Sequence, residues 1–288
     1  MLNLQTTVEI PKGTFQIKHR DKIMLLGSCF ADEMSAKFKE CGFDTLSNPF
    51  GTLYNPASIA ALLLRCISQS EYSEKAKEIF QDGNGIWHSW MHHSRFSSDS
   101  VQTLVRNLNE RTQEAARFLA EANILIITFG TAIIYRLKES DMLVANCHKQ
   151  PDSLFRRERL TAYDITDSWL MVTNILHSIN PNLKIIFTVS PIRHKRDGMH
   201  INQISKGILL QAVDEITAEQ HCYFPSYEIM FDELRDYRFY ADDMIHPSGL
   251  AVEYIWQRFQ ETFMNEKTLA ECRAALKEWK RQQHRTII

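Results

Sequence analysis

The sequence is poor in glycine, and it has no paired cysteines, no long apolar run and no strong net charge. It contains 10 glycines in 288 residues, about half of the usual fraction. The formal net charge of −2 gives no electrostatic basis for binding nucleic acid or an acidic lipid surface. No apolar stretch approaches the length of about 18 residues that a membrane-spanning helix needs. We therefore expect a soluble protein with no nucleic-acid partner and no membrane span.

The cysteines are scattered along the chain. No CxxC pair occurs among them, which excludes a zinc ribbon or a disulfide framework as the first interpretation and favours reduced thiols: Cys29, Cys41, Cys66, Cys147, Cys222 and Cys272. The first residues, MLNLQTTVEIPKG, lack the basic and apolar regions of a secretory signal. We therefore expect a cytoplasmic location.

Short apolar runs alternate with helical patterns over most of the chain. The runs that predict strands are residues 23–26, 43–46, 124–129, 184–189 and 222–224. The strongest are nearly continuous rather than alternating, which is typical of strands buried on both faces of a parallel sheet. The helical patterns cover residues 30–38, 56–67, 98–121, 165–179 and 201–220. This alternation predicts an α/β fold, a three-layer α/β/α sandwich around a flavodoxin-like five-stranded parallel sheet of order 2-1-3-4-5.

Two segments depart from the alternation. Residues 133–137 and 142–146 flank a polar KESD turn, and they predict an antiparallel β-hairpin inserted at the carboxyl end of the sheet. After Pro247 one more helix leads into a charged terminal helix. We therefore divide the chain into a main domain, residues 1–264, and a C-terminal helical extension, residues 265–288.

Ser28 stands where the first predicted strand passes into a helix. Ligands of open α/β sheets bind outside the carboxyl ends of the strands. The free N–H groups and the positive dipole end of the helix would stabilise an alkoxide or oxyanion there. Serine is also a frequent helix N-cap, so a structural role is the alternative.

Asp243 and His246 form a DxxH sequence near the other end of the chain, in YADDMIHPS. A serine hydroxyl needs an adjacent imidazole to take its proton, and the imidazole needs a partner that fixes its tautomer. A DxxH turn can bring a carboxylate and an imidazole together on one short loop. His194 follows the fourth predicted strand and is the rival base, although no acidic residue precedes it at a suitable spacing.

Three histidines lie close together in WHSWMHHSRF: His88, His92 and His93. No acidic or cysteine ligand accompanies them, and tryptophans are interspersed. We interpret this segment as a surface or pocket-lining loop and predict no metal site. No organic cofactor is implied either.

Several motifs together resemble one protein family. GSCFADEM and NPFGTLYNPASI are followed, in order, by HSRFS, TFGTA, VANCHKQP, TVSPIRH and DMIHPS. This series resembles the GSCFA family over roughly residues 20–260, and that family is similar to the SGNH (GDSL-like) hydrolases. The resemblance implies a three-layer α/β/α fold and, in many relatives, esterase activity.

The resemblance also implies roles for particular residues. Ser28 matches the nucleophilic serine, with His246 as general base and Asp243 as the acid that orients it. Gly51 matches the glycine whose backbone N–H helps to form the oxyanion hole, together with the N–H of Ser28. Cys29 is intrinsically the better nucleophile, but we expect a packed, inert side chain that points away from the pocket.

One block departs from the family pattern. SGNH enzymes carry an asparagine shortly after the glycine of the third block, whereas Thr131 and Ala132 follow Gly130 here. We expect Asn48 to supply the missing oxyanion donor because it lies only three residues before Gly51; the alternative is that Asn48 only caps a turn. Thr131 is another candidate for this donor, and His194 is a further candidate for the substrate site. Arg95, Asn146 and His148 could also line the substrate site, or they could equally pin the inserted loops to the sheet.

These observations predict a serine-dependent ester or acyl hydrolase with a Ser-His-Asp triad. We expect small acyl esters as substrates, with O-acetylated carbohydrate as the first class to test. A non-catalytic carbohydrate- or ligand-binding relative is the alternative that the missing asparagine favours. An acyltransferase would use the same nucleophile. The oligomeric state is left open by the sequence.

Overall fold

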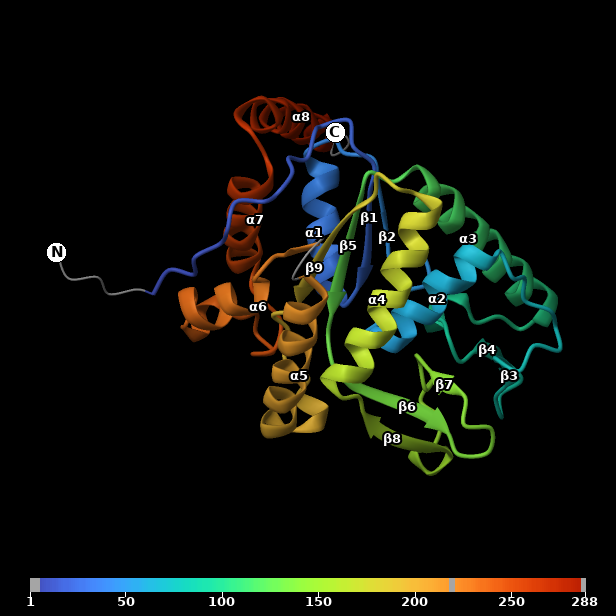
Figure 1. The fold of residues 1–288 in the computed structure, drawn as a ribbon. Helices are drawn as coiled ribbons and strands as arrows, with labels where there is room; N and C mark the ends of the chain where they lie inside the picture. The colour runs from blue at the N-terminus through green and yellow to red at the C-terminus, as the bar shows by residue number, and fades with distance from the viewer. Residues whose placement is uncertain (1–5, 218–220, 286–288) are drawn as a thin grey trace.

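A computed structural model describes residues 6–217 and 221–285, and it shows a parallel β-sheet with helices on both faces (Figure 1). The strand order in the described residues is β10-β9-β5-β1-β2, and every neighbouring pair is parallel. The strands are β1 (Ile23–Gly27), β2 (Thr45–Ser47), β5 (Ile124–Phe129), β9 (Lys184–Val189) and β10 (Cys222–Tyr223). Numbered along the chain, this order is 2-1-3-4-5. The predicted fold class and strand order are confirmed.

The central strands are buried on both faces. Every residue of β1 and β5 is buried, and the two strands pair from Ile23↔Ile124 to Gly27↔Thr128. Gly27 has a φ of +136°, and a Cβ there would collide with the carbonyl oxygen of Thr128. Only glycine fits this position. The close passage of the two backbones sets the path by which the chain leaves β1 and enters the next helix.

Helices form the outer two layers of the sandwich (Figure 1). One face of the sheet is covered by α1 (Cys29–Glu40) and α7 (Gly249–Phe263), with the short α6 (Ser226–Glu228) nearby. The other face is covered by α2 (Pro56–Ser68), α3 (Val101–Glu121), α4 (Ala162–Ile179) and α5 (Met199–Thr217). The last three residues of the predicted helix 201–220 lie outside the described residues. Two apolar cores, one on each face, hold the layers together.

The predicted hairpin is part of a larger insertion beyond the carboxyl ends of the central strands (Figure 1). Strands β6 (Ile133–Leu137) and β7 (Leu143–Val144) pair antiparallel as expected. The sequence did not predict β8 (Phe155–Arg159), which pairs with the other edge of β6. Its sequence, FRRER, is mostly exposed, so it carries no apolar pattern. The hairpin of β3 (Ile79–Gln81) and β4 (Trp87–Ser89) was also missed, because strands of three residues are too short to show a period.

The terminal helix α8 (Glu266–Arg285) packs against the main body. Cys272 is buried and Leu269 partly buried in the same apolar core as Phe38 of α1. The division of the chain after residue 264 falls between α7 and α8 and stays a prediction. None of the helices in residues 6–217 and 221–285 has the length and apolar character to cross a membrane.

Candidate active site

Ser28 is the N-cap of α1, and its side chain is almost fully buried, with 1% exposure. Its Oγ accepts a hydrogen bond from the N–H of Phe30 at 3.3 Å and donates to Oγ of Ser190 at 2.9 Å. Ser190 directly follows β9, so this pair ties the carboxyl ends of β1 and β9 together. The sequence did not single out Ser190, although a serine directly after a predicted strand is the same signal that marked Ser28.

A cavity of about 310 Å³ lies next to this turn, and Ser28 does not line it. Cys29, the first residue of α1, does line it, and its side chain is partly exposed. The expectation that Cys29 points away from the pocket is wrong, although its side chain does pack partly against the apolar core, as expected. The reason is the cap: the side chain of Ser28 turns back onto its own helix, and the next residue is the one that faces the cavity.

Asp243 and His246 form a pair of which only His246 lines the same cavity. Nδ1 of His246 lies 2.6 Å from Oδ2 of Asp243, as the DxxH spacing predicts. The other carboxylate oxygen accepts the N–H groups of Ile245 and His246, at 2.8 and 2.9 Å. These backbone bonds, with the side chain of His246, lower the pKa of Asp243 to about 2. His246 lines the cavity, but no hydrogen bond joins it to Ser28 in the described structure, where the serine hydroxyl donates to Ser190, so the triad stays a prediction.

The two backbone N–H groups predicted as oxyanion donors are engaged elsewhere. The N–H of Ser28 donates to the carbonyl of Thr128 at 3.3 Å, and the N–H of Gly51 donates to the carbonyl of Asn48 at 2.8 Å. The side-chain oxygen of Asn48 accepts the N–H of Gly27 at 2.9 Å. Asn48 and Gly51 do not line the cavity. Oδ1 of Asn48 therefore holds the loop after β2 against the end of β1, whereas its Nδ2 is buried without a hydrogen-bond partner in the described structure. The donor role of Asn48 stays a prediction.

Three of the remaining candidates hold loops in place. Nη2 of Arg95 donates to the carbonyl oxygen of Asn48 at 2.6 Å, which pins the loop after β2. Asn146 accepts the N–H of His148, and Nε2 of His148 lies 2.7 Å from the carbonyl oxygen of Ser89. Burial lowers the pKa of His148 to about 4. None of these side chains lines the cavity, so they match the alternative of loop anchors.

Thr131 and His194 do line the cavity. Oγ1 of Thr131 is 3.0 Å from Oγ of Ser205 and accepts the N–H of Ile133, so its polar atom is already used. Burial, with the nearby Lys206, lowers the pKa of His194 to about 4. His194 is therefore neutral at pH 7. Within the described residues it has no carboxylate partner, which leaves His246 as the better-placed base.

Asn55 is a cavity residue that the sequence did not indicate. It is 6% exposed, and its Oδ1 caps α2 by accepting the N–H of Ser58 at 2.8 Å. The hydrogen bond described for its side chain is this one to Oδ1, with none to Nδ2, and Asn55 lines the cavity. Because the cap fixes the amide orientation, a donor is left unused at the wall of the site. The signal that could have found it is a polar residue before Pro56, in a loop at the carboxyl edge.

Lys206 lies beneath the site and is fully buried, at 1% exposure. Its Nζ donates to the carbonyl oxygens of Gly130 and Ser190, at 2.7 Å each. These residues directly follow β5 and β9. Burial lowers the pKa of Lys206 to about 7. The amine clamps two loops that border the cavity, and a single lysine in a helical pattern gave no signal of this role.

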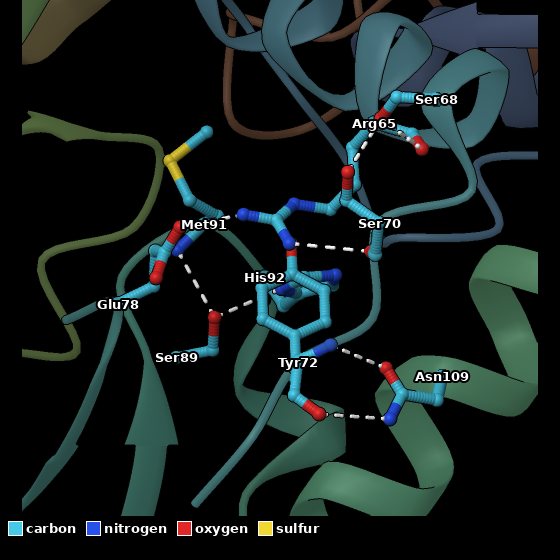
Figure 2. Close-up of polar contacts among 9 residues, drawn as sticks. All are labelled: Arg65, Ser68, Ser70, Tyr72, Glu78, Ser89, Met91, His92 and Asn109. Atoms are coloured by element: carbon cyan, nitrogen blue, oxygen red, sulfur yellow. Dashed lines mark hydrogen bonds and ion pairs between the residues drawn. The ribbon is translucent and has the colours of Figure 1, made fainter. Parts of the chain in front are cut away.

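His92 belongs to a packed cluster of aromatic and polar side chains (Figure 2). Its Nδ1 lies 2.9 Å from Oγ of Ser89, its ring meets the ring of Tyr72 edge-on, and burial lowers its pKa to about 3. Beside it, Arg65 stacks on Tyr72 and pairs with Glu78 at 2.6 Å. These contacts give His92 a structural role within a folded loop region. Across the described residues, no three His, Cys, Asp or Glu side chains are grouped as metal ligands.

The fold and the cavity place the chain among α/β proteins with a polar site at the carboxyl edge of a parallel sheet. The chain belongs to the GSCFA family, whose sequence profile matches residues 22–259. Comparison with curated proteins finds no matching relative.

Among solved structures, the chain is similar to esterases at low sequence identity. One is a carbohydrate esterase of family 3 from Talaromyces cellulolyticus, with 10% identity, a TM-score of 0.38, and coverage of 84% of this chain and 95% of that one. A family 3 carbohydrate esterase of Clostridium thermocellum has 11% identity, a TM-score of 0.36, and coverage of 88% and 98%. An acetyl esterase variant with an acetate ion has 12% identity, a TM-score of 0.36, and coverage of 84% and 95%.

Proposed function

We propose that this protein hydrolyses small acyl esters through a covalent acyl-enzyme, as a branch of the SGNH hydrolases. The observation that carries the proposal is the hydrogen-bonded pair of Asp243 and His246 at a cavity that also receives the start of α1. An imidazole that is hydrogen-bonded to a carboxylate, beside a nucleophile at a helix N-terminus, is the arrangement that acyl transfer needs. Ser28, the nucleophile expected from the sequence, stands at this junction without lining the cavity.

In this mechanism Asp243 orients the imidazole and stabilises the imidazolium that forms. His246 removes the proton of the nucleophile, returns it to the leaving alcohol, and then activates a water molecule. The oxyanion donors in the proposal are the backbone N–H of Cys29 and Nδ2 of Asn55. No hydrogen bond is described for either group, and both residues line the cavity.

The shape of the cavity supports a small acyl group on a polar alcohol. The inserted β6–β7 hairpin contributes the apolar residues Ile133 and Val144 to the lining, and the tyrosines Tyr54 and Tyr135 line the cavity as well. An apolar wall suits an acyl chain, and aromatic faces with hydroxyls suit a sugar. O-acetylated carbohydrate is therefore the substrate class that we propose to test first.

The test is hydrolysis of nitrophenyl acetate and of an acetylated monosaccharide by the purified chain and by His246→Ala. We expect measurable turnover by the wild type and a loss of at least about 10³-fold in kcat for the variant. Equal rates for the two proteins would contradict the proposal. The sharper control is His177→Ala, because this histidine lies on α4 and does not line the cavity.

A non-catalytic binding relative is the second candidate. It is favoured by the hydrogen bonds that occupy the N–H groups of Ser28 and Gly51, the donors that the family resemblance implied. If the protein is such a binding relative, calorimetry should detect binding of acetylated sugars without any turnover. His246→Ala would then change the affinity alone. An acyltransferase would instead show a faster release of nitrophenol when an alcohol acceptor is added.

A further inference from the structure

The two neighbours at the β1–α1 junction face different surroundings. Ser28 is 1% exposed, and its hydroxyl proton is directed to Ser190, which is itself fully buried. Cys29 is partly exposed and lines the cavity that His246 also lines. A group that attacks a carbonyl must reach the substrate and pass its proton to the base. In this structure Cys29 has the access that Ser28 lacks.

The hydroxyl of Ser28 already has a structural role. It accepts the N–H of Phe30 as the cap of α1 and donates to Ser190, whose Oγ in turn accepts the N–H of Ile192 at 3.3 Å. To act as a nucleophile, Ser28 would have to break its bond to Ser190 and turn away from the helix that it caps. Buried hydrogen-bond networks of this kind fix a turn, and opening one leaves polar atoms unpaired.

The surroundings of the Cys29 sulfur suit a nucleophile. Sγ lies 3.5 Å from the hydroxyl oxygen of Tyr54. Burial is the main cause that raises the pKa of Tyr54, and its contact with Cys29 is the next. The phenol therefore stays protonated and can donate to a thiolate. The sulfur also stands at the N-terminus of a 12-residue helix, where the helix dipole favours a negative charge.

A second, independent feature points to an acyl ligand at the same wall. Asn55 is only 6% exposed and lines the cavity. Its Oδ1 is fixed by the N–H of Ser58, and no hydrogen bond to its Nδ2 is described. The N–H of Cys29 is likewise unpaired there, because the cap bonds engage Phe30 and Ala31 instead. Two unused donors beside a thiol form the arrangement that an oxyanion needs.

We propose that Cys29, and not Ser28, is the nucleophile, so that the protein is a cysteine-dependent acyl hydrolase that forms a thioester intermediate. This inference rests on the proposed function. Its new content is the identity of the attacking atom, together with the thiol chemistry that follows from it.

The reaction is balanced with ester and water alone. His246 takes the thiol proton as Sγ bonds to the carbonyl carbon, and the carbonyl oxygen becomes the oxyanion. The oxyanion collapses, the bond from carbon to the alcohol oxygen breaks, and His246 gives its proton to the departing alcohol. Water then attacks the thioester and loses a proton to His246. The C–S bond breaks, the carboxylic acid leaves, and the thiolate recovers the proton from His246.

The decisive experiment compares Cys29→Ala, Cys29→Ser and Ser28→Ala in nitrophenyl acetate hydrolysis. We expect Cys29→Ala to lower kcat by at least about 10³-fold, and Ser28→Ala to lower it by less than about tenfold. Cys29→Ser keeps a nucleophile of the same position and should recover part of the lost rate. Cys147→Ser is the matched control, because Cys147 is also partly exposed but does not line the cavity.

Trapping the intermediate in the wild-type chain gives a readout that does not depend on a variant folding. After acid quench, tandem mass spectrometry should place the acetyl group on Cys29, and neutral hydroxylamine should remove it rapidly, as it does for a thioester. Iodoacetamide should inactivate the wild type at the rate at which Cys29 is alkylated. Thermal unfolding of each variant checks that it is folded.

The outcomes separate this inference from the function on which it rests. Turnover that survives Cys29→Ala and is abolished by Ser28→Ala in a folded protein, with an acetyl group on Ser28, would overturn the cysteine and leave the hydrolase intact. A wild type with no turnover and no acyl adduct on either residue would overturn the proposed function as well.

Discussion

Asp243 binds His246 twice, once through the imidazole Nδ1 at 2.6 Å and once through the backbone N–H at 2.9 Å. The carboxylate therefore fixes both the ring and the turn that carries it. Asp243→Asn should keep the turn but lose the charge that stabilises the imidazolium. We expect kcat to fall by about 10²–10⁴-fold with little change in KM.

Steady-state kinetics on nitrophenyl acetate measures this effect. Asp242→Asn is the matched control, since Asp242 is the adjacent carboxylate and has no bond to the imidazole in the described structure. Equal losses for the two variants would mean that the carboxylates act through the general charge of the loop.

At Asn55 the proposed role of oxyanion donor can be tested separately from the role of helix cap. Asn55→Ser keeps a side-chain oxygen for the N–H of Ser58 but removes the amide N–H. We expect a thermal midpoint close to that of the wild type and a fall in kcat of about 10²–10³-fold. Asn55→Ala should lose the same activity and also about 1 kcal/mol of unfolding free energy. An active Asn55→Ser would exclude the amide as a donor.

The inserted hairpin should set the length of the acyl chain. Ala145 lines the cavity just after β7, so Ala145→Leu fills space beside the apolar wall. We expect kcat/KM for nitrophenyl hexanoate to fall at least about tenfold further than kcat/KM for the acetate, because overpacking a confined site costs about 1–3 kcal/mol. Glu139→Ala, on the exposed tip of the same hairpin, should alter neither ratio. If Ala145→Leu lowers both esters equally, the acyl chain lies elsewhere.

Lys206 should make the stability of the protein depend on pH in the alkaline range. Burial lowers the pKa of Lys206 to about 7 from an ordinary value of 10.5. Between these values the unfolded chain binds one more proton than the folded chain, so the free energy of unfolding rises with pH. Below pH 7 both states are protonated, and the difference is constant.

Urea unfolding of the wild type and of Lys206→Met from pH 6 to pH 10 measures this difference. We expect the free energy of unfolding of the wild type to rise, relative to that of the variant, by up to about 1.4 kcal/mol per pH unit above pH 7. Lys184→Met, at an exposed lysine that begins β9, should run parallel to the wild type. Parallel curves for Lys206→Met would show that the amine keeps its ordinary pKa in spite of burial.

The sequence by itself determined the layers, the strand order and the pairing of acid and base. Nearly continuous apolar runs at 124–129 and 184–189 are typical of strands buried on both faces, and the helical patterns between them leave few ways to connect a parallel sheet. The DxxH spacing brings Asp243 to His246 because both residues lie on one short turn, whose geometry is local.

Only the tertiary structure decided which residues share the cavity. Ser28 and Cys29 are adjacent, and one hydrogen bond to Ser190, 162 residues further along the chain, decides which of the two is committed to the core. The donors of Gly51 and Ser28 are likewise taken by bonds that no spacing reveals, while Asn55 keeps its amide free. Local patterns follow from backbone geometry over a few residues, whereas the orientation of a side chain in a site depends on partners that only the folded chain brings near.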